Sequence, residues 1–339
     1  MSRVQFTKEY LRHTLRGFAG KRIAILGDLM LDRYYWGGVR RVSPEAPVPV
    51  VEVETESVRF GGAANVAQNI RSLGGIPVLV GLIGDDHPGE MFLQMVQEQG
   101  FEGGGIIVDA GRQTTIKTRV IAQGQHVVRI DNETKSPCPP PLVRRIIDSV
   151  TSRLDSLEAV LLEDYNKGVL LPEVIRAVVA AAREHGKIIT VDPKFDNFLE
   201  YRNVTVFKPN RREVEEVLGG RLRTNEDVER AGRKLLDLLE AESVLLTRGE
   251  QGMSLLEANG GVLHLGTVAD NVQDVSGAGD TVISTLTLAL AAGFPLREAC
   301  TLANCAGGVV VGSVGIVPIE LDPLIEAAVR FTATTHTDV

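Results

Sequence analysis

The segment with the richest chemistry reads Asp-Val-Ser-Gly-Ala-Gly-Asp over residues 274–280, and an apolar run follows it. Gly277 and Gly279 allow backbone conformations closed to bulkier residues, and Ala278 adds only a methyl group. If a helix begins here, its first N–H groups lack intrahelical partners and form an anion site suited to phosphate. Asp280 is then placed to accept a proton from an attacking hydroxyl. The motif alone leaves a plain helix cap open as the alternative.

Two further segments offer polar groups suited to a polyhydroxylated ligand. Gly61 and Gly62 precede a predicted helix whose first turn carries Asn65. Asp28 and Asp32 follow the first predicted strand, where α/β sheets place ligands. Carboxylates accept hydrogen bonds from hydroxyls, so this arrangement favours a sugar. Read alone, the glycine motif is explained equally well by tight helix packing.

Polar residues also follow the later predicted strands, in the segments VDPK, FKPNRREVE and TRGEQG. In the first two segments they are Asp192, Lys194, Lys208, Asn210 and Glu213. Because parallel strands end at one edge of a sheet, we expect these side chains to gather there. Glu213 is placed to hold a metal ion through water, and Lys194 to neutralise phosphate. The small and polar residues of TRGEQG suit the underside of a nucleotide.

Apolar β-branched runs alternate with helical patterns along the chain. This alternation predicts an α/β fold with a doubly wound, mostly parallel sheet and helices on both faces. The predicted strands are residues 22–26, 78–84, 159–162, 187–191, 204–207 and 243–246. The predicted helices are residues 62–73, 88–100, 141–155, 171–185, 211–218, 225–239, 278–292 and 296–311.

Two stretches, residues 48–54 and 115–131, alternate apolar and polar residues without a helix between them. The second contains Gln-Gly-Gln, a hairpin-turn signal. These stretches predict a small antiparallel lobe that serves as a lid, with strands over about 36–58 and 112–132. Its half-exposed apolar residues predict a homodimer.

The overall charge argues against some classes of partner. Acidic residues outnumber basic residues 44 to 36, so neither nucleic acid nor an anionic membrane is an expected partner. Cys138, Cys300 and Cys305 show no paired spacing, which favours reduced thiols. The N-terminus lacks an apolar signal-peptide core, and no apolar run reaches membrane-spanning length. We therefore expect a cytoplasmic protein.

The pairing of GGAANVAQNI with DVSGAGD resembles the ribokinase-like (PfkB) family of sugar kinases. Within that family, GDLMLDRYYWGGVRRVSPEAPVPVVEVE, FGGAANVAQNI and DVSGAGDTVI are most similar to the heptose 7-phosphate kinases of lipopolysaccharide-core synthesis. Many such kinases are joined to a nucleotidyltransferase domain with an HxGH motif, which this sequence lacks. The resemblance therefore implies a single kinase domain over residues 1–339 and a separate nucleotidyltransferase acting downstream.

The resemblance implies that ATP, with Mg²⁺, phosphorylates the anomeric hydroxyl of D-glycero-D-manno-heptose 7-phosphate to the 1,7-bisphosphate, for ADP-heptose synthesis. It assigns Asp280 as the base, the amides of Gly277–Gly279 as the anion hole, and Asn210 and Glu213 to Mg²⁺ and phosphate positioning. The implied nucleotide-side positions also include Lys208, Thr247, Gly249, Gly252 and Asn304. The implied sugar-side positions are Asp28, Asp32, Gly61, Gly62, Asn65 and Asp192.

The substrate's own phosphate requires cations. The candidates are Lys117, Arg119, Lys194, Arg40 and Arg41. Each can equally be a solvated surface charge. The family motif often has Thr where Val275 stands, so one side-chain hydrogen bond is lost.

Three other functions are alternatives to the heptose kinase. A kinase for ribose, fructose or a fructose phosphate would keep the same fold and base. A non-catalytic sugar sensor has no need of Asp280, which is present. A dinucleotide oxidoreductase would require GxGxxG after the first strand, where GDLMLD stands instead.

Overall fold

The structure is a computed structural model that describes residues 4–269 and 271–334. Its main body is a nine-stranded sheet in the order β13-β12-β11-β10-β9-β8-β1-β4-β5. The strands from β11 to β5 run parallel, whereas β12 and β13 are antiparallel additions at one edge. The bounds are β1 Arg22–Gly27, β4 Ile76–Gly84, β5 Glu102–Asp109, β8 Ala159–Glu163, β9 Ile188–Asp192, β10 Val206–Phe207, β11 Ser243–Thr247, β12 Met253–Glu257 and β13 Val262–Leu265.

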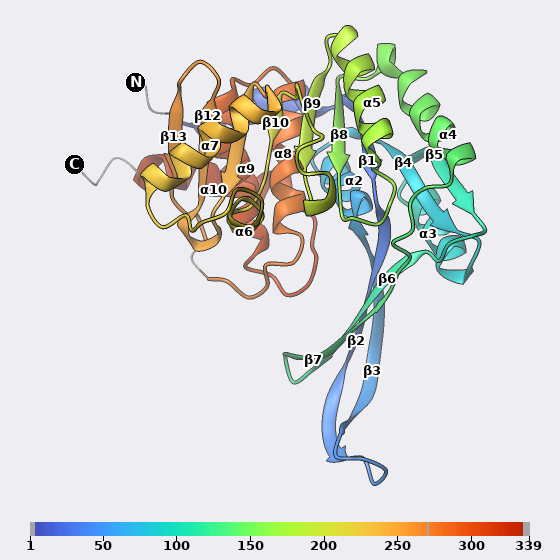
Figure 1. The fold of residues 1–339 in the computed structure, drawn as a ribbon. Helices are drawn as coiled ribbons and strands as arrows, with labels where there is room; N and C mark the ends of the chain where they lie inside the picture. Colours follow the sequence, from blue (N-terminus) through green and yellow to red (C-terminus); the bar gives the residue numbers. More distant parts are fainter. Residues whose placement is uncertain (1–3, 270, 335–339) are drawn as a thin grey trace.

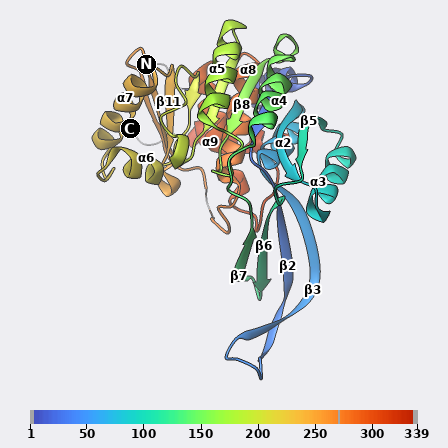
Figure 2. The same cartoon turned by 45° about the vertical axis from the view of Figure 1, so that its right-hand side comes forward.

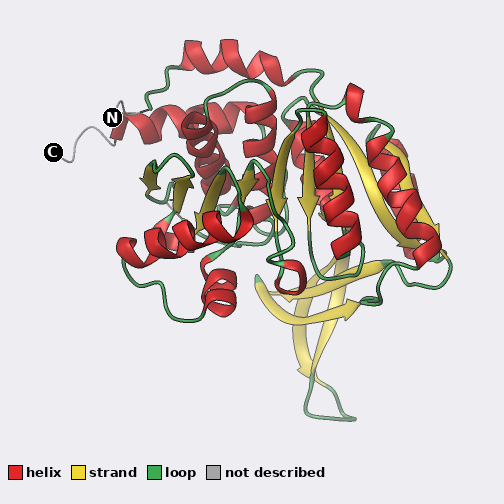
Figure 3. Cartoon of the chain, turned by 45° about the horizontal axis from the view of Figure 1, so that its top comes forward, coloured by secondary structure: helices red, strands yellow, loops and turns green. Residues whose placement is uncertain are grey.

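Helices cover both faces of this sheet, which confirms the predicted fold class (Figures 1 and 3). Alternate residues of β1 belong to different cores: Ile23 and Ile25 to one, Ala24 and Leu26 to the other. This is why the parallel strands are apolar at nearly every position. The helices are α1 Lys8–Thr14, α2 Ala63–Ser72, α3 His87–Glu98, α4 Pro140–Thr151, α5 Pro172–Glu184, α6 Arg211–Leu218, α7 Asn225–Leu239, α8 Ala278–Ala291, α9 Leu296–Val310 and α10 Leu321–Thr334.

A second, four-stranded sheet in the order β3-β2-β6-β7 extends from the main body as a long arm (Figures 1 and 2). Its strands are β2 Leu29–Val42, β3 Pro49–Gly62, β6 Thr115–Ala122 and β7 Gln125–Asn132. The predicted hairpin turn is confirmed, because Gln123 and Gly124 both have positive φ between β6 and β7. We call these four strands the lid.

Several elements are longer than the sequence patterns predicted, and others were not predicted. β2 begins at Leu29, so Asp32 lies inside a lid strand and not in a loop after β1. The strands β5, β12 and β13 and the helices α1 and α10 were not predicted. β5 contains three consecutive glycines, which weaken the strand pattern. Among residues 4–269 and 271–334, no helix combines the length and apolar character needed to cross a bilayer.

Candidate active site

The Gly-Ala-Gly turn leads directly into α8, as predicted. Gly277 caps the helix in the left-handed region, with φ of 77°. The preceding acid, Asp274, has a structural role, because its carboxylate accepts hydrogen bonds from the backbone N–H of Ser276 (2.9 Å) and of Gly315 (3.0 Å). The N–H of Ala278 donates to the carbonyl of Val275 at 3.2 Å. Asp274 thus shapes the turn and leaves Asp280 as the acid inside the site.

Asp280 is held by a donor at each carboxylate oxygen and is only 3% exposed. Asn65 Nδ2 donates to one oxygen at 2.7 Å, and the Tyr165 hydroxyl donates to the other at 2.8 Å. Burial raises the pKa of Asp280 to about 6. The carboxylate is therefore mostly ionised at neutral pH and has a basicity well suited to accept a proton.

Two lysines from neighbouring strand ends stand beside this turn. Lys208 Nζ lies 2.7 Å from Asp192, and Lys194 Nζ lies 2.7 Å from Glu213. A methyl group added at Gly279 would lie 3.5 Å from Asp192 Oδ2 and 3.6 Å from Lys208 Nζ. The first turn of α8 therefore faces a buried ammonium group across a space that only a side-chain-free residue keeps open. The N–H groups of the helix start and the Lys208 ammonium, which is paired with Asp192, therefore face the same position, an arrangement suited to a phosphate.

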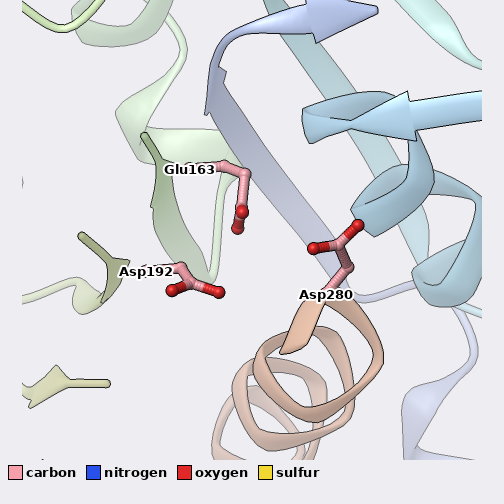
Figure 4. Close-up of side chains that lie close together, drawn as sticks. All are labelled: Glu163, Asp192 and Asp280. Carbon is pink, nitrogen blue, oxygen red and sulfur yellow. The ribbon is translucent and has the colours of Figure 1, made fainter. Parts of the chain in front are cut away.

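Three buried carboxylates meet beside the start of α8 (Figure 4). Glu163, Asp192 and Asp280 each bring an oxygen within 4.8 Å of the others. Neither oxygen of Glu163 has a hydrogen-bond partner among the described residues, and burial raises the pKa of this carboxyl well above its ordinary value. Carboxylate oxygens are the ligands that Mg²⁺ prefers. An orphaned buried Glu163 beside Asp192 therefore fits a divalent cation.

Sequence reasoning missed Glu163 and placed the metal at Glu213. Glu163 ends β8 and is the register partner of Asp192 at the end of β9. An acid directly after the apolar run AVLL was the available signal. Glu213 instead closes a capping box with Asn210, and its other oxygen accepts the hydrogen bond from Lys194. Glu213 is not part of the three-carboxylate cluster found among the described residues.

A cavity of about 440 Å³ lies on the other side of the turn. The predicted nucleotide positions Thr247, Gly249, Gly252 and Asn304 line it, as do Ala278 and Gly279. Asn304 is oriented by its amide N–H, which donates to the carbonyl of Gly266 at 2.8 Å. The rest of the wall is mostly small or apolar, so the cavity suits an aromatic base whose phosphates reach the start of α8.

The predicted sugar-side residues meet where the lid joins the main sheet. Asp32 on β2 forms a buried ion pair with Arg119 on the adjacent strand β6. A side chain at Gly61 would collide with the Asp32 carboxylate, and Gly62 has a positive φ of 54° that favours glycine. These two glycines therefore let β3 pass close to the acid and turn into α2, which carries Asn65.

Asp28, predicted to lie on the sugar side, is buried against the loop that follows β8. Its buried carboxylate accepts hydrogen bonds from the backbone N–H of Tyr165 (2.8 Å) and of Lys167 (3.1 Å). Burial, and then the nearby Asp164, raise its pKa to about 6. Asp28 thus anchors the loop that follows β8. Tyr165, on that loop, is a second site residue that the sequence did not single out.

Four of the candidate phosphate cations already have carboxylate partners: Lys117, Arg119, Lys194 and Arg40. Lys117 lies 3.0 Å from Asp131 and 3.2 Å from Glu133. Although burial acts in the other direction, hydrogen bonds from Lys167 and Lys117 lower the pKa of Glu133 to about 2. Arg40 faces Glu52 at 3.6 Å on the exposed outer part of the lid. Arg41, at the same end, is exposed.

The family follows from a comparison with known proteins. The pfkB family carbohydrate kinase model matches residues 21–320. This chain belongs to the PfkB family of carbohydrate kinases. It is therefore a phosphotransferase that uses ATP with Mg²⁺ and an alcohol acceptor.

Curated relatives and solved structures agree with this assignment. The chain is 42% identical over 304 residues to the bifunctional protein HldE of Helicobacter pylori, covering 90% of this chain and 66% of the relative. It is 43% identical over 291 residues to HldE of Geobacter sulfurreducens, covering 86% and 59%. The chain thus spans 59–66% of the length of these relatives.

Two solved structures share the fold at low sequence identity. Phosphofructokinase-2 from Escherichia coli, in complex with potassium, superposes with a TM-score of 0.77 at 18% identity, covering 93% of this chain and 99% of that one. Arabidopsis thaliana ribokinase, complexed with ribose and ATP, gives a TM-score of 0.71 at 18% identity, covering 91% and 99%.

Proposed function

We propose that this kinase transfers the γ-phosphoryl group of ATP to the anomeric hydroxyl of D-glycero-D-manno-heptose 7-phosphate. The observation that carries the phosphoryl-transfer chemistry is Asp280, fixed between two donors at the start of α8 with Lys208 beside it. The choice of sugar is supported by the segments that resemble heptose 7-phosphate kinases and by the identity of 41–44% to HldE proteins over 86–93% of the chain.

In this mechanism Asp280 accepts the proton of the attacking hydroxyl, a contribution of about 10²–10⁴ in rate. The N–H groups of Gly279 and Asp280, which have no backbone acceptor among the described residues, and Lys208 hold the phosphoryl group as it moves. Glu163 and Asp192 would hold Mg²⁺, which when bound neutralises charge on the phosphates. The base and the phosphate cradle belong to one short segment, so the distance between them is set by the backbone.

The two substrates occupy opposite sides of that segment. The nucleotide lies in the cavity lined by Thr247, Gly249, Gly252 and Asn304. The sugar lies under the lid root, near Asn65 and the Asp32–Arg119 pair. We assign its phosphate to the basic groups there, Lys117 and Arg119, where it would replace carboxylates as the partner of Lys117. Closure of the lid would then exclude water from the reaction.

A panel of acceptors with coupled detection of ADP tests the choice of substrate. The panel contains D-glycero-D-manno-heptose 7-phosphate, ribose, fructose and fructose phosphates. We expect the highest kcat/KM with the heptose phosphate. Turnover of unphosphorylated ribose with none of the heptose phosphate would replace this proposal with the ribokinase-type alternative.

We also propose a homodimer formed through the lid, and a nucleotidyltransferase as the enzyme that takes up the product of the kinase reaction. β7 is an edge strand of the lid, and all of its residues are exposed. One of the structural neighbours is described as a tetrameric form of phosphofructokinase-2. The dependence on ATP, and the buried free thiols of Cys138, Cys300 and Cys305, favour the cytoplasm.

A further inference from the structure

Tyr165 connects three parts of the site. Its hydroxyl donates to Asp280 Oδ1 at 2.8 Å. Its ring lies 5.3 Å from Lys194 Nζ, which is a cation–π distance. Its backbone N–H donates to the buried carboxylate of Asp28 at 2.8 Å. Among the described residues, Asn65 is the only other side chain that hydrogen-bonds to the Asp280 carboxylate.

The loop that carries Tyr165 is fixed from both ends. Asp28 binds the backbone N–H groups of Tyr165 and Lys167. Asn166 adopts a positive φ of 55°, and its N–H donates to Asp164 at 2.8 Å. Asparagine adopts this conformation more readily than most residues, and the hydrogen bonds to Asp28 and Asp164 hold the loop in it. The phenol is therefore placed before any ligand binds.

We propose that Tyr165 is a positioning residue that fixes the direction in which Asp280 accepts the proton of the acceptor hydroxyl. The proposal rests on Asp280 being the base. Asn65 holds one carboxylate oxygen and Tyr165 the other, so the carboxylate cannot rotate without breaking a buried hydrogen bond. Each oxygen keeps one lone pair for the substrate. The acceptor hydroxyl then meets a base whose open lone pairs already point in a defined direction.

This role also explains Asp28. Its carboxylate reaches the reaction only through the backbone of the loop that carries Tyr165. The other oxygen of Asp28 is buried without a hydrogen-bond partner among the described residues. Asp28 holds Tyr165, and Tyr165 holds Asp280.

The chain offers a matched control in Tyr201. This tyrosine is also buried, and its hydroxyl donates to a carboxylate, that of Asp164, at 2.6 Å. No hydrogen bond joins Tyr201 to Asp280, and the other oxygen of Asp164 still accepts from the N–H of Asn166 when the Tyr201 hydroxyl is removed. Tyr201→Phe therefore removes a comparable buried hydrogen bond without touching the base, and reports what the loss of such a bond does to the fold.

The experiment measures kcat, both KM values and thermal unfolding for Tyr165→Phe, Tyr201→Phe, Asp280→Asn and the Tyr165→Phe/Asp280→Asn double variant. The acceptor is the heptose 7-phosphate, or the best acceptor of the panel if the heptose phosphate is not turned over. We expect Tyr165→Phe to lower kcat about 10- to 100-fold with KM for ATP unchanged, because a misdirected base is poorly aligned. Tyr201→Phe should keep the parent's kcat.

The double variant separates positioning from structure. If Tyr165 acts through Asp280, the second change adds nothing to the loss caused by Asp280→Asn. Losses that multiply, or a Tyr165→Phe variant with parental kcat beside an inactive Asp280→Asn, would overturn the role of Tyr165 alone. Near-parental kcat in Asp280→Asn would overturn the proposed base and this inference with it. Tyr165→His, which keeps a ring and a donor, should recover part of the kcat that Phe loses.

Discussion

Glu163 and Asp192 end the central strands β8 and β9, and Asp280 lies in the first turn of α8; we call this region the sheet edge. These three carboxylates are almost fully buried, with exposed fractions of 0% for Glu163, 7% for Asp192 and 3% for Asp280. The outer strand of the lid is the reverse, because every residue of β7 is exposed, including Val128 and Ile130. At the sheet edge, charge is buried in advance of its ligand. In the lid, apolar surface is exposed in advance of whatever covers it.

The charges of the two regions also differ in how they are compensated. Glu163 has no hydrogen-bond partner among the described residues, so part of its desolvation cost stays uncompensated until a cation binds. Lys117, at the lid root, is shared between two acids. Ligand binding should therefore change the free energy of unfolding most at the sheet edge. Substitution of exposed residues should affect association with a second copy most in the lid.

Gly279→Ala tests the sheet edge and carries the largest expected effect. The added methyl group meets its neighbours at ordinary van der Waals distances of 3.5 and 3.6 Å, so the fold should tolerate it. It would occupy the space between α8 and Lys208 that we assign to the phosphoryl group. We expect kcat/KM to fall by about 10³-fold, of the order reported for loss of a transition-state donor, in steady-state assays.

The lid supplies the control for that variant. A methyl group added at Gly38, on β2, meets nothing within 4 Å. Gly38→Ala should therefore retain parental kcat/KM and thermal stability. Equal activity in the two alanine variants would show that phosphate does not approach Gly279.

A second comparison uses the pH dependence of folding without ATP or Mg²⁺. Burial raises the pKa of Asp280 from 3.8 to about 6. Protonated Asp280 therefore stabilises the fold fully below about pH 3.8, and this contribution is lost as the pH rises through about 6. The loss is about 3 kcal/mol at most. Asp280→Asn should reduce the slope of stability with pH, measured by urea unfolding between about pH 4 and about pH 7, and should leave the part that comes from Asp28 and Glu163.

Asp131 in the lid should behave with the opposite sign. Although its slight burial acts in the other direction, the hydrogen bond from Lys117 lowers the pKa of Asp131. The stability that it contributes is present above its unfolded pKa and is lost as the pH falls through its folded pKa. Asp131→Asn should therefore lower stability slightly at neutral pH, where Asp280→Asn raises it. The same sign in both variants would contradict the contrast between the regions.

Glu163→Gln addresses the cation with a smaller expected effect. The substitution keeps the shape of the side chain and removes the charge that we assign to Mg²⁺. The Mg²⁺ concentration for half-maximal activity should rise about 10-fold, measured by titration at fixed ATP. Glu133→Gln at the lid root, which also removes an acid, should leave that concentration unchanged. Equal Mg²⁺ dependence in both variants would remove Glu163 from the cation site.

The sequence predicted the parts of this site that depend on residues adjacent in the chain. Gly277 to Asp280 form a helix start whose chemistry follows from adjacent residues, and the apolar runs of the parallel strands set the sheet. Glu163 and Tyr165 were missed because their partners, Asp192 and Asp280, are distant in the chain and only the strand register brings them together. The acid after the apolar run AVLL is a local signal for Glu163, but no neighbouring residue shows that it meets Asp192.

The lid shows the same limit. The sequence of β2 contains aromatic, acidic and glycine residues without a regular alternation. Its strand conformation depends on pairing with β3 on one side and β6 on the other. Asp28 was interpreted as a sugar ligand from its place after β1. Its burial under the loop at Tyr165 depends on a contact across 137 residues, which composition and periodicity do not report.

Val128→Asp tests the lid as an interface and is expected to leave the chemistry nearly intact. Val128 is 48% exposed on β7, an edge strand with unpaired backbone groups, and is well placed to meet a second copy. Val108, 45% exposed on the edge strand β5 of the main sheet, is its matched control. Light scattering after size exclusion should give a dimer for the parent and for Val108→Asp, and a monomer for Val128→Asp. A dimer that survives Val128→Asp but not Val108→Asp would move the interface to the main sheet, and the lid would then be only a cover for the sugar.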